Sequence, residues 1–358
     1  MRPFLEEEIE PLATGAWILG TGGGGSPYHG YLNLRQLYRA GRRVDLIAPD
    51  ELGDDDAVAV VSAMGAPMVG LERLTDPEIL VRAVRLMEEY LGRPFQAIMP
   101  LEIGGGNALQ PFLAAALMDL PVVDADAMGR AFPEAQMTSF AIADLQMFPL
   151  SLSDIRDNAV VITRAASWKW MERISRKICV EVGSVAATCK APRTGREVKD
   201  HAIHGTVTKA VKLGRTVSAA RREHRDPVRA ILELEGGKFI FSGKVWDVER
   251  RTTEGFLRGH AVIAGLDQDR GEQLTIDFQN EYIVASRGGA PVVTTPDLIC
   301  VVDSASGEAI GTETLRYGQR VSVIALPAAP VLTTPKGLEH VGPRAFGHKL
   351  EFRSVFQQ

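Results

Sequence analysis

Two kinds of hydrophobic pattern alternate along the first 165 residues. Spacing typical of an amphipathic helix is formed first by Leu5, Ile9, Leu12, Ala16 and Leu19. Further helical patterns cover residues 31–40, 76–90 and 107–118. Short continuous apolar runs, which favour buried strands, lie between them at 57–61, 97–100, 121–123 and 159–163. This alternation predicts an α/β fold in three layers, with a parallel or mixed sheet between helices.

The pattern changes near residue 236 to seven short β-rich runs separated by glycine-containing turns, which predicts an all-β sandwich or barrel. We therefore expect an α/β domain at 1–166, a helical connecting region at 167–235, and a β-rich domain with a C-terminal tail at 236–358. Residues 190–225 carry ten Lys or Arg against three acids. We interpret this basic segment as a solvated helix face.

Composition excludes several classes of protein. Of the 358 residues, 45% are hydrophobic and 24% charged, as in globular proteins. The net charge of -5 argues against binding to nucleic acid or to an anionic membrane. Three widely spaced cysteines fit no disulfide framework, and the acidic N-terminus does not resemble a signal peptide. We expect a cytoplasmic protein that forms a homo-oligomer such as a dimer.

The first glycine cluster raises the question of a nucleotide. Gly20, Gly22 and Gly25 fit the GxGxxG spacing. A helical pattern rather than a strand precedes them, however, and the first later acid, Asp45, comes 25 residues after Gly20. No nucleotide cofactor is expected. Two explanations of the run Gly22, Gly23, Gly24 and Gly25 stay open: the loop packs tightly, or its backbone amides contact a ligand.

The second cluster follows a predicted strand and precedes a predicted helix. Free amides at a helix start favour an anion, so a substrate carboxylate could bind there. Glu102, just beyond the strand end, is a structural partner for nearby amides or a proton-transfer group. The candidate substrate-binding residues are Gly22, Gly23, Gly24, Gly104, Gly105, Gly106, Asn107, Arg130 and His29.

An acidic turn follows the next predicted strand. Asp124 and Asp126 lie at its carboxyl end, where ligands bind in open parallel sheets. With Glu134, they could hold a divalent metal through oxygen atoms, or one carboxyl group could stay protonated. Alternatively, Arg130 pairs with an aspartate only to fix the loop. No serine or cysteine lies in a nucleophile motif, so water activated by a carboxylate, a histidine or a metal is the expected reactant.

Five segments together resemble one family. They are GTGGGGSPY near the start, LEIGGGNA, PVVDADAMGRAFPE, TPDLI at 295–299 and GPRAFG at 342–347, and they look like the S-methyl thiohydantoin desulfurase family. The resemblance spans nearly the whole chain. It implies an N-terminal α/β domain, a C-terminal β-rich domain and hydrolysis of an S-methylated thiohydantoin, or a related cyclic amide, to a hydantoin and methanethiol. Zinc is the candidate metal.

Combining the resemblance with the residues gives a specific hypothesis. Asp124 or Asp126, with or without a metal, activates water, and Glu102 protonates or orients the heterocyclic substrate. Asn107 hydrogen-bonds the ring amide, and the amides around Gly23 and Gly105 hold a substrate carboxylate. This requires the acidic turn and both glycine clusters to converge on one cleft. The alternative is a non-catalytic ligand-binding or regulatory subunit that works with a hydantoinase-type enzyme.

Overall fold

The N-terminal sheet contains eight strands in the order β1-β2-β5-β4-β3-β9-β7-β8. The computed structural model describes residues 1–70, 72, 74 and 76–357, so Gln358, the last residue of the expected β-rich domain, lies outside it. The strands are β1 (Arg2–Phe4), β2 (Val44–Ile47), β3 (Ala57–Gly65), β4 (Ala97–Pro100), β5 (Val122–Val123), β7 (Leu150–Ser153), β8 (Ala159–Ile162) and β9 (Val185–Thr194). Strands β2, β5, β4 and β3 are parallel, and the others pair antiparallel. The predicted mixed α/β sheet is confirmed.

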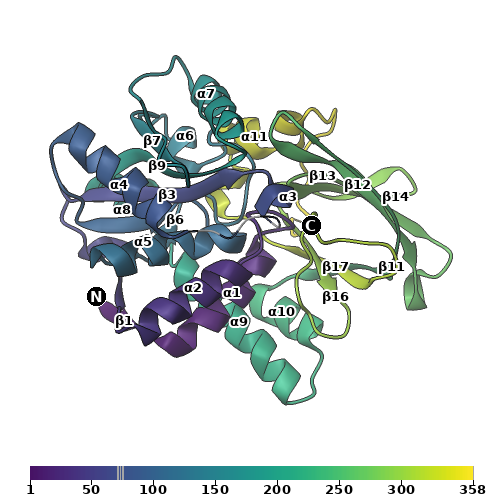
Figure 1. The fold of residues 1–358 in the computed structure, drawn as a ribbon. Helices are drawn as coiled ribbons and strands as arrows, with labels where there is room; N and C mark the ends of the chain where they lie inside the picture. Colours follow the sequence, from purple (N-terminus) through teal and green to yellow (C-terminus); the bar gives the residue numbers. More distant parts are fainter. Residues whose placement is uncertain (71, 73, 75, 358) are drawn as a thin grey trace.

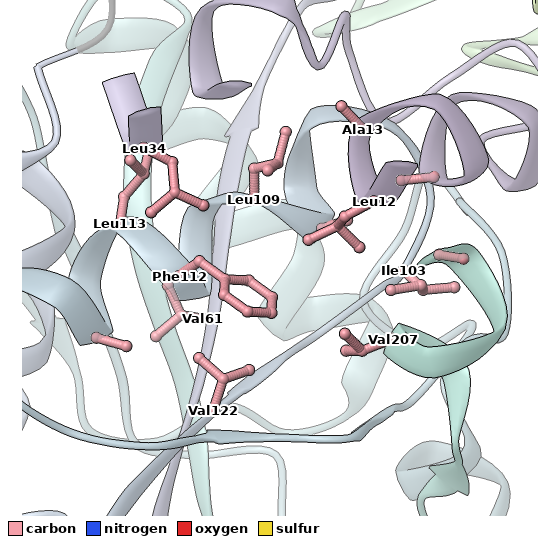
Figure 2. Packing of buried hydrophobic residues seen from close by; sticks show 14 of the residues in the cluster. Leu12, Ala13, Leu34, Val61, Ile103, Leu109, Phe112, Leu113, Val122 and Val207 are labelled. Carbon is pink, nitrogen blue, oxygen red and sulfur yellow. The ribbon is translucent and has the colours of Figure 1, made fainter. Parts of the chain in front are cut away.

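Several helices cover one face of this sheet. They are α1 (Glu6–Leu19), α2 (Tyr28–Arg39), α4 (Glu78–Leu91), α5 (Gln110–Met118) and α9 (Thr206–Arg222), while α10 (Pro227–Glu235) packs against α9 and the C-terminal sheet. Figure 2 shows the core that they form with the sheet, where Phe112 of α5 and Leu12 of α1 pack near Val122 and Val61. This continuous buried apolar surface supplies most of the stabilisation of the α/β part.

Helices α1 and α9 lie side by side (Figure 1). They approach closely because a glycine faces the partner backbone on each helix. A Cβ atom on Gly15 would lie 1.8 Å from the carbonyl oxygen of Ala210, and one on Gly214 would lie 1.9 Å from that of Pro11. The opposite face of the sheet packs against short elements: α6 (Ser139–Ile142), α8 (Gly195–His201) and α11 (Pro335–Val341).

The basic segment 190–225 is only partly a helix face. Its first residues belong to β9, and Lys190 and Arg193 are both buried there. The interpretation of the whole segment as a solvated helix face is therefore wrong at its start, because a strand in the sheet interior holds two of its cations. Before β9, helix α7 (Trp168–Glu181) forms within the helical connecting region predicted at 167–235.

The C-terminal sheet is antiparallel throughout, in the order β15-β14-β13-β12-β11-β17-β16. Its strands are β11 (Lys238–Thr253), β12 (Phe256–Gly265), β13 (Gln273–Gln279), β14 (Glu281–Arg287), β15 (Ala290–Thr294), β16 (Leu298–Asp303) and β17 (Arg320–Leu326). The sheet curls as a half-barrel (Figure 1), which confirms the predicted β-rich architecture. Two of the seven predicted β-rich runs join into one strand, β11, which contains two β-bulges. Within the described residues, no helix combines the length and apolarity needed to span a bilayer.

Candidate active site

A cavity of about 370 Å³ lies where the two sheets meet. The end of β3 and the segment after β4 form one side, and Asn280, Glu281 and Glu313 come from the C-terminal part. The first glycine cluster, the second glycine cluster and the acidic turn reach it through Gly25, Gly106 and Glu134. The three segments thus converge on one cavity, as the sequence hypothesis required.

Close packing accounts for the two glycine clusters. The Gly106 amide donates to the Gly25 carbonyl oxygen at 2.7 Å. A Cβ atom on Gly24, whose φ is +73°, would lie 2.3 Å from the Gly104 carbonyl oxygen, and one on Gly105 would lie 2.7 Å from that of Gly23. Of the predicted glycines, two line the cavity, Gly24 and Gly106, and four do not: Gly22, Gly23, Gly104 and Gly105. The tight-packing explanation of the clusters therefore fits the structure except at Gly25, where a Cβ atom would meet nothing within 4 Å.

Glu102 is a buried carboxyl group at the cavity wall, 5% exposed. Its Oε1 accepts a hydrogen bond from the Asn107 side-chain amide, and its Oε2 accepts one from the Phe132 backbone at 3.0 Å. The Asn107 Oδ1 accepts from the Ala63 amide at 2.7 Å, which fixes the orientation of that side chain. Burial raises the pKa of Glu102 to about 7, against the opposing effect of these donors.

Two further buried carboxyl groups come from the C-terminal part. Burial raises the pKa of Glu281 well above its usual value, and the neighbouring Glu102 raises it further. Within the described residues, the Glu281 Oε2 has no hydrogen-bond partner. Gly23 makes room for this side chain, because a Cβ there would lie 2.0 Å from the Glu281 Oε1. Burial likewise raises the pKa of Glu313 to about 7.

Arg130 lies behind the cavity wall and does not line it. Its guanidinium donates to the Thr21 hydroxyl at 2.5 Å and to the carbonyl oxygens of Pro296 and Asp297 at 3.2 Å. It also stacks over the Phe132 ring, 4.5 Å from the centroid. Arg130 is 1% exposed, and its charge opposes the upward shift of the Glu281 pKa. It therefore connects the acidic turn to the first glycine loop and the C-terminal sheet.

Asp124 and Asp126 lie outside the cavity lining. The Asp124 carboxylate accepts hydrogen bonds from the Thr208 amide at 3.0 Å and from the Thr208 hydroxyl, at the start of α9. The fully buried Asp126 accepts from the amides of Ile103, Met128 and Gly129 through its Oδ2. Burial raises the Asp126 pKa to about 7 despite these bonds. Both side chains hold backbone segments together.

The predicted metal ligands do not fit one shared ion. Asp124 and Asp126 are engaged as just described, while Glu134 accepts from Gln136 at 2.6 Å and Gln279 at 3.0 Å. Nowhere in the described part of the chain do three His, Cys, Asp or Glu side chains form a group that could bind a metal. A metal therefore stays a prediction, and we derive no step through one. His29 is half-buried and does line the cavity.

The two halves of the chain each match a family model. The description S-Me-THD-like, N-terminal domain, matches residues 7–164, and S-Me-THD-like, C-terminal domain, matches residues 166–355. The chain belongs to the S-Me-THD-like family. The resemblance to the S-methyl thiohydantoin desulfurases is thereby confirmed. No curated protein matches the chain.

A solved structure has the same fold as this S-Me-THD-like chain. It is the crystal structure of a protein from Chromobacterium violaceum, with a TM-score of 0.85 and 24% sequence identity. The similarity covers 99% of this chain and 100% of that one. At this identity the comparison supports the architecture of both domains and no more.

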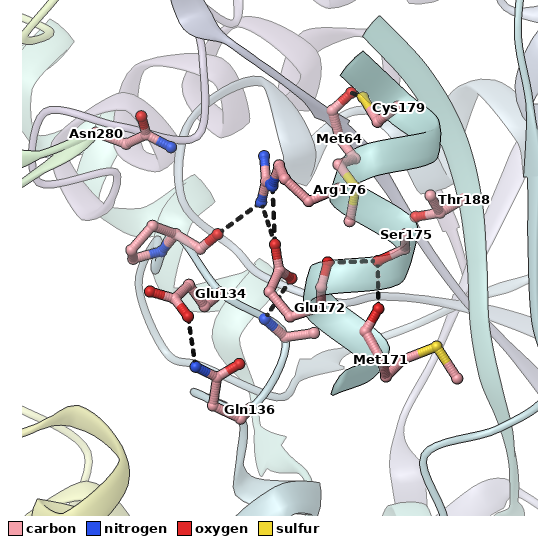
Figure 3. A network of polar contacts seen from close by, with 12 residues as sticks. Met64, Glu134, Gln136, Met171, Glu172, Ser175, Arg176, Cys179, Thr188 and Asn280 are labelled. Carbon is pink, nitrogen blue, oxygen red and sulfur yellow. Dashed lines mark hydrogen bonds and ion pairs between the residues drawn. The ribbon is translucent and has the colours of Figure 1, made fainter. Parts of the chain in front are cut away.

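The cavity of this S-Me-THD-like chain is also lined by charged residues that were not predicted from the sequence. Figure 3 shows Glu172 and Arg176 of α7, whose side chains form an ion pair at 2.7 Å. Glu172 also accepts from the Ala135 amide at 3.0 Å, and Arg176 donates to the Pro133 carbonyl oxygen at 2.9 Å. Through these hydrogen bonds, the ion pair fixes the end of the acidic turn beside the cavity. The sequence shows only that Glu172 and Arg176 are spaced i,i+4 on a helix with other charged residues. Because this pattern is common on exposed helix surfaces, it did not indicate a buried pair.

Lys190 of β9 is the second missed group. It lines the cavity and is 7% exposed. Burial lowers the pKa of Lys190 to about 8. A lysine between apolar and small residues, as in Val185–Thr194, was the available signal, because lysine is rarely buried without a reason.

Proposed function

We propose that the chain hydrolyses an S-methyl thiohydantoin, or a related hydantoin-type ring, and releases methanethiol and the hydantoin. The observation that carries this proposal is the pair of buried carboxyl groups, Glu102 and Glu281, in one cavity. A volume of about 370 Å³ suits a small heterocycle. Membership of the S-Me-THD-like family supports the substrate class.

The two carboxyl groups have different roles in this proposal. Both oxygens of Glu102 accept hydrogen bonds from nitrogen donors, an environment that suits the ionised form, so Glu102 takes a proton from the attacking water. Burial raises the pKa of Glu281 well above its usual value, which favours the protonated form and suits Glu281 to act as the acid. It donates that proton to the ring nitrogen. Carboxyl groups in different environments divide acid and base work in this way.

The atoms of the reaction balance with one water. Its oxygen bonds to the carbon that carries sulfur, and that carbon passes through a tetrahedral intermediate. The carbon–sulfur bond then breaks, the electron pair leaves with sulfur, and the hydroxyl of the intermediate becomes the carbonyl oxygen. Of the two water protons, the ring nitrogen and the thiol gain one each in net terms, once the proton that Glu102 accepted returns through water to Glu281.

The pH dependence of the reaction follows from the state of Glu102. Its carboxylate is the active form, so kcat/KM should rise with pH as Glu102 loses its proton near pH 7. A pH–rate profile measured by thiol release tests this. A rise centred below pH 5 would assign the base to a solvated carboxylate and contradict the role of Glu102.

Asp124→Ala separates this proposal from the hypothesis made on sequence alone. If Asp124 activates water, the variant loses turnover. We expect instead that thiol release persists and the free energy of unfolding falls by about 1 kcal/mol, because the side chain satisfies the Thr208 amide and hydroxyl at the start of α9. Urea unfolding and thiol release on the same preparation measure both quantities. Loss of turnover in a fully folded variant would restore Asp124 as the base.

Incubating the purified protein with S-methyl thiohydantoins, with and without a chelator, tests the proposal as a whole. Thiol release that depends on Glu102 supports a hydrolase, whereas saturable binding without release supports the alternative of a regulatory subunit. Activity lost to the chelator and restored by zinc would support the predicted metal. A cytoplasmic location and a homo-oligomer remain predictions, and light scattering measures the latter.

A further inference from the structure

Lys190 places a cation in the cavity without a direct partner. It lies opposite Val60 in the β3–β9 pairing, near a bulge in that ladder. The side chain is 7% exposed, and its ammonium makes no hydrogen bond and no ion pair within 4 Å to any residue that the structure describes. A largely buried cation without a direct partner is unfavourable for folding, so its presence at the cavity lining points to a role with a ligand.

The groups around Lys190 are all engaged elsewhere. Helix α7 contributes Glu172 and Arg176, which pair with each other, and the buried thiol of Cys179. The segment after β4 contributes Glu102, which accepts hydrogen bonds from Asn107 and the Phe132 amide. Burial is the main cause of the lowered Lys190 pKa, and the Arg176 charge adds to it, while Glu172 and Glu102 oppose it.

The proposed function leaves one proton transfer without a residue. Glu102 accepts from water and Glu281 donates to the ring nitrogen, but the departing alkanethiolate also needs a proton. Proton donors act best when their pKa is close to that of the group they serve and to the working pH. The pKa of a cysteine thiol is about 8.5, and that of a simple alkanethiol such as methanethiol is higher. The pKa of Lys190 is about 8, so its ammonium is acidic enough to protonate the departing thiolate.

We propose that the Lys190 ammonium donates this proton to sulfur as the carbon–sulfur bond breaks. The electron pair of that bond goes to sulfur, and methanethiol leaves as the neutral thiol. The neutral amine regains a proton, through water, from the hydroxyl that becomes the carbonyl group. This inference rests on the proposed function and adds a catalytic residue to it.

The test uses Lys190→Met with two substrates that differ in the leaving group. With the S-methyl compound we expect kcat/KM to fall by at least about 100-fold. With an S-(4-nitrophenyl) thiohydantoin, whose thiolate is stable without a proton, we expect a loss below about 10-fold. Methionine fills a similar volume and removes an unpaired charge, so the variant should fold, and circular dichroism and thermal unfolding check this.

Lys209→Met is the matched control, because Lys209 of α9 pairs with Glu235 at 2.8 Å and lies outside the cavity lining. It should keep wild-type rates with both substrates. The wild-type rate with the S-methyl compound should fall above about pH 8, and Lys190→Met should lack this fall. Equal losses with both substrates, or a persisting alkaline fall, would overturn the role of Lys190. If the wild type releases no thiol from either compound, the proposed function itself fails and this inference fails with it.

Discussion

Replacing Glu102 with Gln is expected to lower kcat/KM for thiol release by about 10²- to 10⁴-fold, the range typical for loss of a general base. The amide cannot accept the proton of the attacking water. Thiol detection with an S-methyl thiohydantoin gives the rate. The variant should also lose the rise in rate near pH 7, since no other group in the proposal titrates as the base there.

Glu134→Gln is the matched control for this variant. Glu134 lines the same cavity, but hydrogen bonds from Gln136 and Gln279 occupy its two oxygens. We expect at most a few-fold change in rate. Thermal unfolding must accompany both measurements, because the new amide group in Glu102→Gln would face a nitrogen donor, either Asn107 or the Phe132 backbone. A folded Glu102→Gln protein with wild-type rates would remove Glu102 from the mechanism.

Periodicity in the sequence was sufficient to predict the elements around the site. Helix α1 and the strands β3 and β4 follow directly from runs whose burial depends on local spacing. Strand β9 was missed because its two cations, Lys190 and Arg193, indicate a solvated segment when only neighbours in sequence are considered. Their burial depends on contacts with β3 and α7, which no local pattern reveals.

The sequence also predicted at which edge of the sheet the site lies, but it did not predict which carboxyl groups at that edge face the cavity. Asp124 and Asp126 do lie where a parallel strand ends, as Glu102 does. Which of the three carboxyl groups faces the cavity depends on hydrogen bonds from other segments. Thr208, 84 residues later, donates to Asp124, and three backbone amides donate to Asp126.

Glu281 belongs to the C-terminal sheet and has no motif around it. The run of glycines correctly indicated a place where the backbone packs closely, but the sequence did not show which side chain it packs against. Gly23 is small because Glu281 occupies the space beside it. The link between a glycine near the N-terminus and an acid 258 residues later exists only in the folded chain.

Arg130→Met should produce the largest loss of stability, about 3–5 kcal/mol, because it leaves several buried acceptors without a donor, each at a cost of about 1–3 kcal/mol. The variant leaves the Thr21 hydroxyl and the carbonyl oxygens of Pro296 and Asp297 without their donor. It also removes the cation that holds down the pKa of Glu281, so that group should stay protonated to still higher pH. Urea unfolding followed by two independent probes measures the free energy.

The control for this variant is Arg229→Met, in which an exposed arginine loses only a surface pair with Glu233. That change should alter the unfolding free energy by less than about 1 kcal/mol. If Arg130→Met is no more destabilising than Arg229→Met, other donors satisfy the carbonyl oxygens, and the guanidinium is not what joins the acidic turn to the C-terminal sheet. A large fall in the unfolding free energy would mean that the cavity depends on Arg130. Glu102 and Glu281 line the cavity from the N-terminal and C-terminal parts of the chain, and Arg130 connects these two parts.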